Sequence, residues 1–169
     1  MEYSSVNNPA RQTSKKSQHG VPISAKWLGG AGALPFIVLS SLSFYVETPL
    51  VERTIFALII YGAVILSFLG GIHWGLAIST PGLSRNKTKL FLFLLISVFP
   101  PLIGWLALLL TVPAGLMVLG IAFLAMLLYD WIALRKGLTP KWYLKLRGPL
   151  TVFASGSSML MAVIQFYQS

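Results

Sequence analysis

The chain has 169 residues, of which 56% are hydrophobic and 10% are charged, with a mean hydropathy of +0.77. Soluble domains carry about 25% charged residues, so this composition predicts a membrane protein. The net charge of +9 suits a surface that faces anionic lipid, and the long apolar stretches argue against a nucleic-acid-binding protein. Because the chain has no cysteine, disulfides, thiolate metal sites and cysteine nucleophiles are excluded.

Residues 1–26 form a polar segment with five serines and four basic residues against one acid. The segment lacks the apolar core of a secretory signal peptide, so we expect a disordered basic tail that stays in the mature protein. A basic, serine-containing and acid-poor tail also resembles a mitochondrial transit peptide, which we keep as the weaker alternative.

Five apolar stretches follow the tail, and each is close to the roughly 20 residues that a helix needs to cross a bilayer. We place them at about residues 27–46, 54–79, 88–110, 113–134 and 149–166. The sequence therefore predicts an all-α polytopic membrane bundle of five transmembrane helices, formed by one domain over residues 27–169.

The third and fourth predicted helices come from one apolar tract of 47 residues, 88–134. A straight helix of this length would measure roughly 70 Å, more than twice the hydrocarbon core, so the tract must turn back. Pro113 suits the first turn of a helix, where its missing N–H costs nothing, and we place the turn at residues 111–113. Pro100 and Pro101 then fall inside the third helix.

The basic residues predict an orientation in the membrane. All 13 except Arg53 lie in the tail or in the connections after the second and fourth helices. Since Lys and Arg favour the cytoplasmic side, the N-terminus is predicted inside and the C-terminus outside. We expect the inner (cytoplasmic) membrane of a bacterium, with its anionic lipid against the basic surface, and keep the mitochondrial inner membrane as the alternative.

The connection before the fifth span, RKGLTPKWYLKLRGP, predicts a short interfacial helix between the fourth and fifth helices. This helix would hold Trp142 and Tyr143 at head-group level and Lys145 against lipid phosphate. Two interpretations stay open, namely a basic loop with aromatic anchors and a specific site for a head group or a protein partner.

Small residues recur along the first and second helices and predict close helix packing. In lipid, helices associate through small residues that let their backbones approach. An inside N-terminus brings the two small-residue series to the same depth, so we expect them to meet. The predicted packing residues are Gly29, Ala33, Ala63, Ser67, Gly70, Gly71 and Gly75.

His73 and Asp130 are the ionisable residues that stand out within the predicted spans. At 100° per residue His73 points away from Gly71 and Gly75, and ionisable groups in spans usually face the bundle interior and a partner. Asp130 could pair with His73 or with a basic residue such as Arg147. The functional interpretation is a proton or ligand relay, and the structural one is a buried hydrogen-bonded pair.

Two stretches, YGAVILSFLGGIHWGLA (residues 61–77) and PKWYLKLRGPLT (residues 140–151), resemble an uncharacterised family of small membrane proteins. This family is catalogued as domain of unknown function 3429, the transmembrane protein 69-like family, and the likeness runs from about residue 27 to the fifth helix. The resemblance implies a membrane location and a shared helical core, and it implies no activity.

These observations favour a non-enzymatic membrane component that packs with itself or with a membrane protein partner through its small-residue faces. The alternative is a small-molecule or proton-coupled transporter with a polar site near His73 and Asp130. An enzyme needs at least two convergent catalytic groups, and this is the one candidate pair, so we predict no enzyme and no catalytic residues. With two histidines, one of them in the tail, we expect no metal site, and we expect no cofactor.

Overall fold

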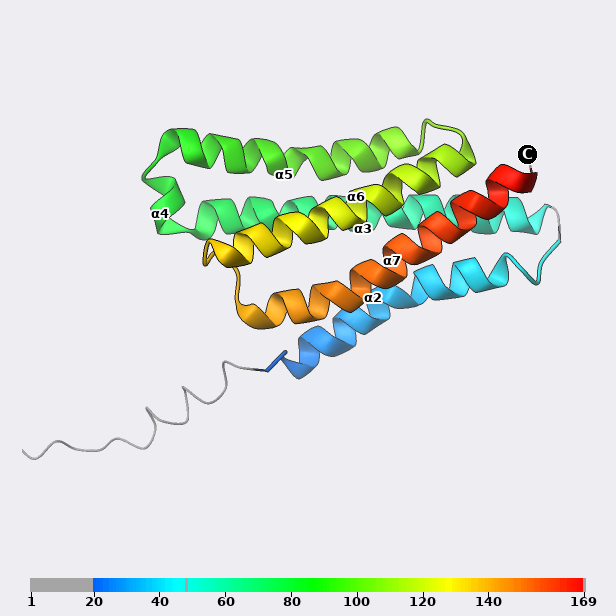
Figure 1. The fold of residues 1–169 in the computed structure, drawn as a ribbon, viewed down its shortest axis with the longest axis horizontal. Coiled ribbons are helices and arrows are strands. Elements are labelled where there is room, and N and C mark those ends of the chain that lie inside the picture. Colours follow the sequence, from blue (N-terminus) through cyan, green and yellow to red (C-terminus); the bar gives the residue numbers. More distant parts are fainter. Residues whose placement is uncertain (1–19, 48, 169) are drawn as a thin grey trace, which may run out of the picture.

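The computed structural model describes residues 20–47 and 49–168, in which every regular element is a helix. Most of the predicted tail, residues 1–19, lies outside the described residues. Within them, five helices are long and apolar enough to cross a membrane: α2 (Ile23–Leu42), α3 (Leu50–Ser79), α5 (Lys87–Ala107), α6 (Val112–Arg135) and α7 (Lys141–Gln168). A four-residue helix, α4 (Pro81–Ser84), joins α3 to α5. The predicted all-α bundle of five membrane-spanning helices is confirmed (Figure 1).

The long helices run up and down in chain order, with α3 and α6 in the middle of the bundle (Figure 1). Among the described residues, α3 contacts α2, α5, α6 and α7, whereas α2 packs against α3 and α7 alone. The most extensive contacts join α6 to α7 and α3 to α5. The core therefore lies around α3 and α6, which supply most of its buried side chains, including Leu58, Leu66, Leu116, Leu119 and Phe123.

The hairpin between α5 and α6 lies where the prolines predict it. α5 ends at Ala107, α6 begins at Val112, and Pro113 falls in the first turn of α6. α5 continues through both Pro100 and Pro101. At the other end of α6, Gly137 has φ 72°, and the N–H groups of Gly137 and Leu138 donate to the carbonyls of Leu134 and Ala133. This is a glycine-capped helix end, in which the left-handed residue turns the chain back.

The segment after Gly137 differs from the prediction of a separate interfacial helix. Residues 141–147 form the first turns of α7, which runs on through Pro149 without interruption. A proline inside a helix removes one backbone hydrogen bond, and this commonly ends the helix in water. Membrane helices tolerate it because neighbouring groups satisfy the freed carbonyl. The prediction of a break at Pro149 was therefore wrong.

The two small-residue series of α2 and α3 do not meet as predicted. A Cβ atom added at Gly71 or Gly75 would meet no atom within 4 Å. Gly29 instead lies against Leu146 and Leu150 of α7, at 3.1 and 3.2 Å from such an atom. The reason is that α7, whose place depends on the whole bundle, packs against the N-terminal half of α2 in place of α3.

Gly70 does act as a packing residue, against α5. A Cβ atom at Gly70 would lie 2.5 Å from the Ser97 carbonyl oxygen and 2.8 Å from Cδ of Pro101. Pro101 has no N–H to donate to the Ser97 carbonyl four residues earlier, so α5 presents a proline and a carbonyl without its usual helical partner at this point. The glycine of α3 fits against both. Ala63 packs nearby in the same way, because Gly104 of α5 lies against its backbone.

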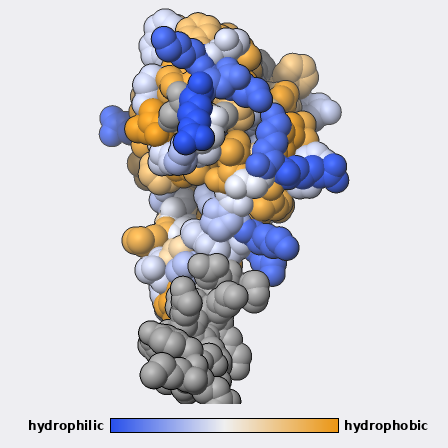
Figure 2. All heavy atoms as spheres, turned by 90° about the vertical axis from the view of Figure 1, so that its left-hand side faces the viewer, coloured by the Kyte–Doolittle hydropathy of each residue, from blue (hydrophilic) through white to orange (hydrophobic). Residues whose placement is uncertain are grey.

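Exposed basic side chains gather at one end of the bundle, which Figure 2 shows face on. We call this the basic end. Its residues are Lys26, Arg85, Lys87, Lys89, Arg135, Lys136, Lys141 and Lys145. The opposite end carries Glu47, Glu52 and Arg53. These exposed charges thus lie in the end turns of the long helices or in the connections between them, as a bundle that crosses a bilayer requires.

Replacement of Gly70 by alanine is expected to lower the free energy of unfolding by about 1–3 kcal/mol, because the added methyl group overlaps the Ser97 carbonyl. Gly71→Ala is the matched control, since it has room for a methyl group and gains about 0.5–1 kcal/mol of helix propensity. Reversible unfolding in mixed detergent micelles measures both. Equal stability of the two variants would contradict the close contact between α3 and α5.

Candidate functional site

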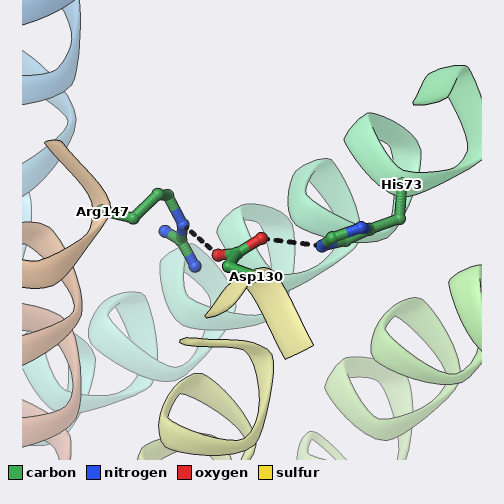
Figure 3. Close-up of polar contacts among 3 residues, drawn as sticks. All are labelled: His73, Asp130 and Arg147. Atoms are coloured by element: carbon green, nitrogen blue, oxygen red, sulfur yellow. Dashed lines mark hydrogen bonds and ion pairs between the residues drawn. The ribbon is translucent and has the colours of Figure 1, made fainter. Parts of the chain in front are cut away.

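Three polar side chains meet between α3, α6 and α7 (Figure 3). His73 comes from α3, Asp130 from the last turns of α6, and Arg147 from the second turn of α7. Their exposed fractions are 3%, 1% and 6%, respectively. The sequence left either His73 or Arg147 as the partner of Asp130, and the structure places both of them against the carboxylate.

Asp130 bridges the two basic side chains through its two oxygens. Nε of Arg147 donates a hydrogen bond of 2.8 Å to Oδ2. Nε2 of His73 lies 2.9 Å from Oδ1, close enough for an ion pair when the histidine is protonated, although the two atoms form no hydrogen bond. A buried charge without a partner is strongly unfavourable, so this arrangement stabilises the carboxylate where three helices converge.

Aromatic and hydroxyl side chains surround this polar cluster. The Tyr129 ring contacts His73 edge on, with ring centroids 4.6 Å apart. The Tyr143 hydroxyl lies close enough to Asp130 for the two groups to interact electrostatically. Tyr143, Arg147 and the buried Thr151 recur at four-residue spacing, which puts them on one face of α7. That spacing is the signal in the sequence that adds Tyr143 and Thr151 to the site, whereas the prediction of an interfacial helix places Tyr143 at head-group level.

Several polar atoms around Asp130 are buried without a hydrogen-bond partner. Among the described residues they include Nη2 of Arg147, the hydroxyl of Tyr129 and, one turn beyond Arg147 on α7, the hydroxyl of Thr151. The cluster therefore holds unused hydrogen-bond donors in addition to its ion pairs. Within residues 20–47 and 49–168, no three histidine, cysteine or carboxylate side chains come together as a metal site would require.

Two cavities lie beside the cluster. The larger has a volume of about 490 Å³, lies between α2, α3, α6 and α7, and is lined by Tyr143 and Arg147 among mostly apolar side chains. The smaller, of about 180 Å³, lies between α3, α5 and α6 and reaches Tyr129. His73 and Asp130 line neither cavity. Asp130 is thus separated from the larger cavity by the guanidinium and phenol groups that face it.

The remaining predicted site residues are distributed over the bundle. Trp142 lines the larger cavity and stands edge to face against Tyr143, with ring centroids 6.3 Å apart. Lys145 is exposed at the basic end. Ala33 and Ala63 are buried, and the Ser67 hydroxyl donates to the Ala63 carbonyl of its own helix at 2.8 Å.

Comparison with known proteins places the chain in a family. The sequence pattern of the family described as "Protein of unknown function (DUF3429)" matches residues 21–164, which include the polar cluster and nearly all of the five long helices. The chain belongs to this family. The resemblance inferred from the two sequence stretches is therefore confirmed.

A curated relative of the family extends the comparison. Over 143 residues the chain is 39% identical to Transmembrane protein 69 of Xenopus tropicalis, and this match covers 82% of the chain and 53% of the relative. The chain therefore spans about half the length of the curated relative it matches. No solved structure matches the chain. A location in a membrane, as a multi-pass protein, follows from the relative's name together with the five apolar helices.

Asp130→Asn is expected to lower the free energy of unfolding by about 3–5 kcal/mol, because it leaves the buried Arg147 without its counter-charge. Glu52→Gln removes an exposed acid at the opposite end and should change stability by no more than about 0.5 kcal/mol. Detergent unfolding monitored by circular dichroism measures both variants.

An apolar replacement of the whole pair, Asp130→Leu with Arg147→Met, distinguishes the cost of an unpaired buried charge from the contribution of the pair itself. This double variant should regain most of the stability that Asp130→Asn loses, because no unpaired charge remains. A double variant less stable than Asp130→Asn would show that the cluster does more than neutralise its own charges.

Proposed function

We propose that the protein is a non-enzymatic membrane component that associates with itself or with a membrane protein partner through one face of α3. This association face consists of Ser67, Gly71 and Gly75. Gly71 is exposed, and Cβ atoms added at Gly71 and Gly75 would meet nothing within 4 Å, which is the observation that carries the proposal. A small-residue face in contact with lipid lets a second helix approach closely.

The side chains beside this face support the proposal. Phe68 and Trp74 lie about 60° to either side of Gly71 around α3 and are 64% and 45% exposed. They border a shallow strip of small residues with two large apolar walls. A partner helix laid along the strip would cover glycine backbone that lipid chains solvate poorly and would gain van der Waals contact on both sides.

The polar cluster takes a structural role in this proposal. His73, Asp130 and Arg147 join three helices, Arg147 balances the charge of Asp130, and neither described cavity is lined by His73 or Asp130. A small-molecule or proton-coupled transporter remains the alternative. It is favoured by one contact, since Arg147 lines the larger cavity and donates directly to Asp130.

The proposal includes an orientation and a membrane. The basic end would face the cytoplasm and contact anionic lipid, so the N-terminus would lie inside and the C-terminus outside. The inner membrane of a bacterium is the proposed location, and the mitochondrial inner membrane is the alternative.

Gly71→Leu together with Gly75→Leu should abolish association while leaving the fold of the single chain intact, because both side chains have room. Gly156→Leu is the control, since it places the same side chain at an exposed glycine of α7. Cross-linking in native membranes and light scattering of the purified protein in detergent report the associated form. Association that persists at its normal level in the Gly71 and Gly75 variant contradicts the proposal.

The orientation can be tested because the chain has no cysteine of its own. In intact cells a membrane-impermeant thiol reagent should label Arg53→Cys, which lies at the end opposite the basic end. It should label Lys141→Cys, at the basic end, only after the membrane is permeabilised. Labelling of both in intact cells, or the opposite pattern, overturns the proposed topology.

A further inference from the structure

The larger cavity has the shape and the polarity of a lipid-binding site. We propose that it binds one acyl chain of an anionic phospholipid, with the phosphate at the basic end. This goes beyond the association face of α3, since it assigns a ligand to the cavity between α2, α3, α6 and α7, which shares the Phe68 side chain with the border of that face.

The cavity is about as long as one leaflet of a bilayer. Along α7 its lining extends from Trp142 to Ala154, which corresponds to roughly 18 Å of helix. Half of a hydrocarbon core about 30 Å thick is close to this length. Its volume of about 490 Å³ lies within the range of about 300–1,000 Å³ that is typical of ligand pockets.

The walls of the cavity are apolar and reach the outer surface of the bundle. Leu28 of α2 and Phe68 of α3 line it and are 76% and 64% exposed. In a bilayer these side chains border hydrocarbon, so the cavity is open to lipid from the side. Gly29 and Gly32 of α2 also line it, and the missing side chain of Gly32 leaves room there, since an added Cβ would meet only the Tyr61 hydroxyl.

The cavity wall contains one buried charged side chain that can donate a hydrogen bond to a ligand. Arg147 lines the cavity, is 6% exposed, and uses Nε for Asp130, whereas its Nη2 has no hydrogen-bond partner. The Tyr143 hydroxyl beside it is buried and faces Asp130. An arginine with a free N–H is a donor that suits a phosphate or ester oxygen.

The exposed charges at the mouth favour an anionic head group over a neutral one. Ala25 and Trp142, in the first turns of α2 and α7, mark the cavity at the basic end. Lys26, Lys141 and Lys145 are exposed in the same turns, and Figure 2 shows hydrophilic side chains across this end. Lysines that lie close together at head-group level attract anionic lipid.

Native mass spectrometry of the full chain, released from detergent with added lipid, tests the proposal. Two lipids with identical acyl chains serve as probes, dioleoyl phosphatidylglycerol and dioleoyl phosphatidylcholine. Gly32→Leu fills the cavity, since an added Cβ there meets only the Tyr61 hydroxyl at 4.0 Å. Gly30→Leu is the matched control on the same helix, because Gly30 has open space around it and lies outside the lining.

The unaltered protein should retain one phosphatidylglycerol per chain and bind phosphatidylcholine at least about tenfold more weakly. Gly32→Leu should weaken phosphatidylglycerol binding by about tenfold or more, and Gly30→Leu by less than about twofold. Should Gly32→Leu fail to fold, Ala25→Leu, which also projects into the lining, gives the same comparison. Lys141→Gln with Lys145→Gln should remove most of the preference for the anionic lipid.

Three results would overturn the inference. Equal binding of phosphatidylglycerol by Gly32→Leu and Gly30→Leu would mean that the lipid does not bind in the cavity. Equal retention of the two lipids would remove the role of the basic end. A change in oligomeric state of Gly32→Leu without a change in lipid binding would mean that a second copy of the chain occupies the cavity. None of these results depends on whether Gly71 and Gly75 mediate association.

Discussion

The Asp130 carboxylate constrains how the helices of this bundle can be arranged. It is buried near one end of α6, and a charge in that position requires counter-charges in direct contact. Arg147 of α7 supplies a counter-charge at 2.8 Å, and Nε2 of His73 of α3 lies 2.9 Å from the other carboxylate oxygen. Because both contacts are short, they fix the rotation and the depth of α3 and α7 relative to α6. Apolar packing alone would leave both free to slide in lipid.

The remaining helix contacts use groups that are effective in hydrocarbon, where apolar side chains gain little by leaving lipid for protein. α5 joins α3 where Gly70 faces Pro101 and the Ser97 carbonyl. α2 joins α3 through the Tyr61 hydroxyl, which donates to the Gly32 carbonyl at 2.8 Å. Ser155 of α7 donates to the Gly120 carbonyl of α6 at 3.0 Å. Close backbone approach and interhelical hydrogen bonds thus hold the helices together in addition to the contacts of Asp130.

The unbroken course of α7 connects the polar cluster to the lipid-facing side of the molecule. Since its first turns continue into the span, Trp142 and Tyr143 turn toward α2 and α3, and Arg147 reaches Asp130 on one side and the larger cavity on the other. A separate interfacial helix would have kept these residues at the surface. The same geometry lets one arginine both stabilise the bundle and offer a donor to a lipid head group.

The amino-acid pattern was enough to predict the fold class, the number of long apolar helices and the turn at Pro113. These features depend on local properties, namely the length of each apolar stretch and the backbone chemistry of proline, which do not change with the neighbouring helices. It also identified His73, Asp130 and Arg147, because ionisable residues in apolar spans require partners. Three features became visible in the folded bundle alone. Both basic residues contact Asp130, α7 passes through Pro149, and Gly29 meets α7 while Gly71 and Gly75 have no neighbour among the described residues. A stripe of small residues indicates that another helix can approach its own helix closely. Which helix does so depends on how all five pack together.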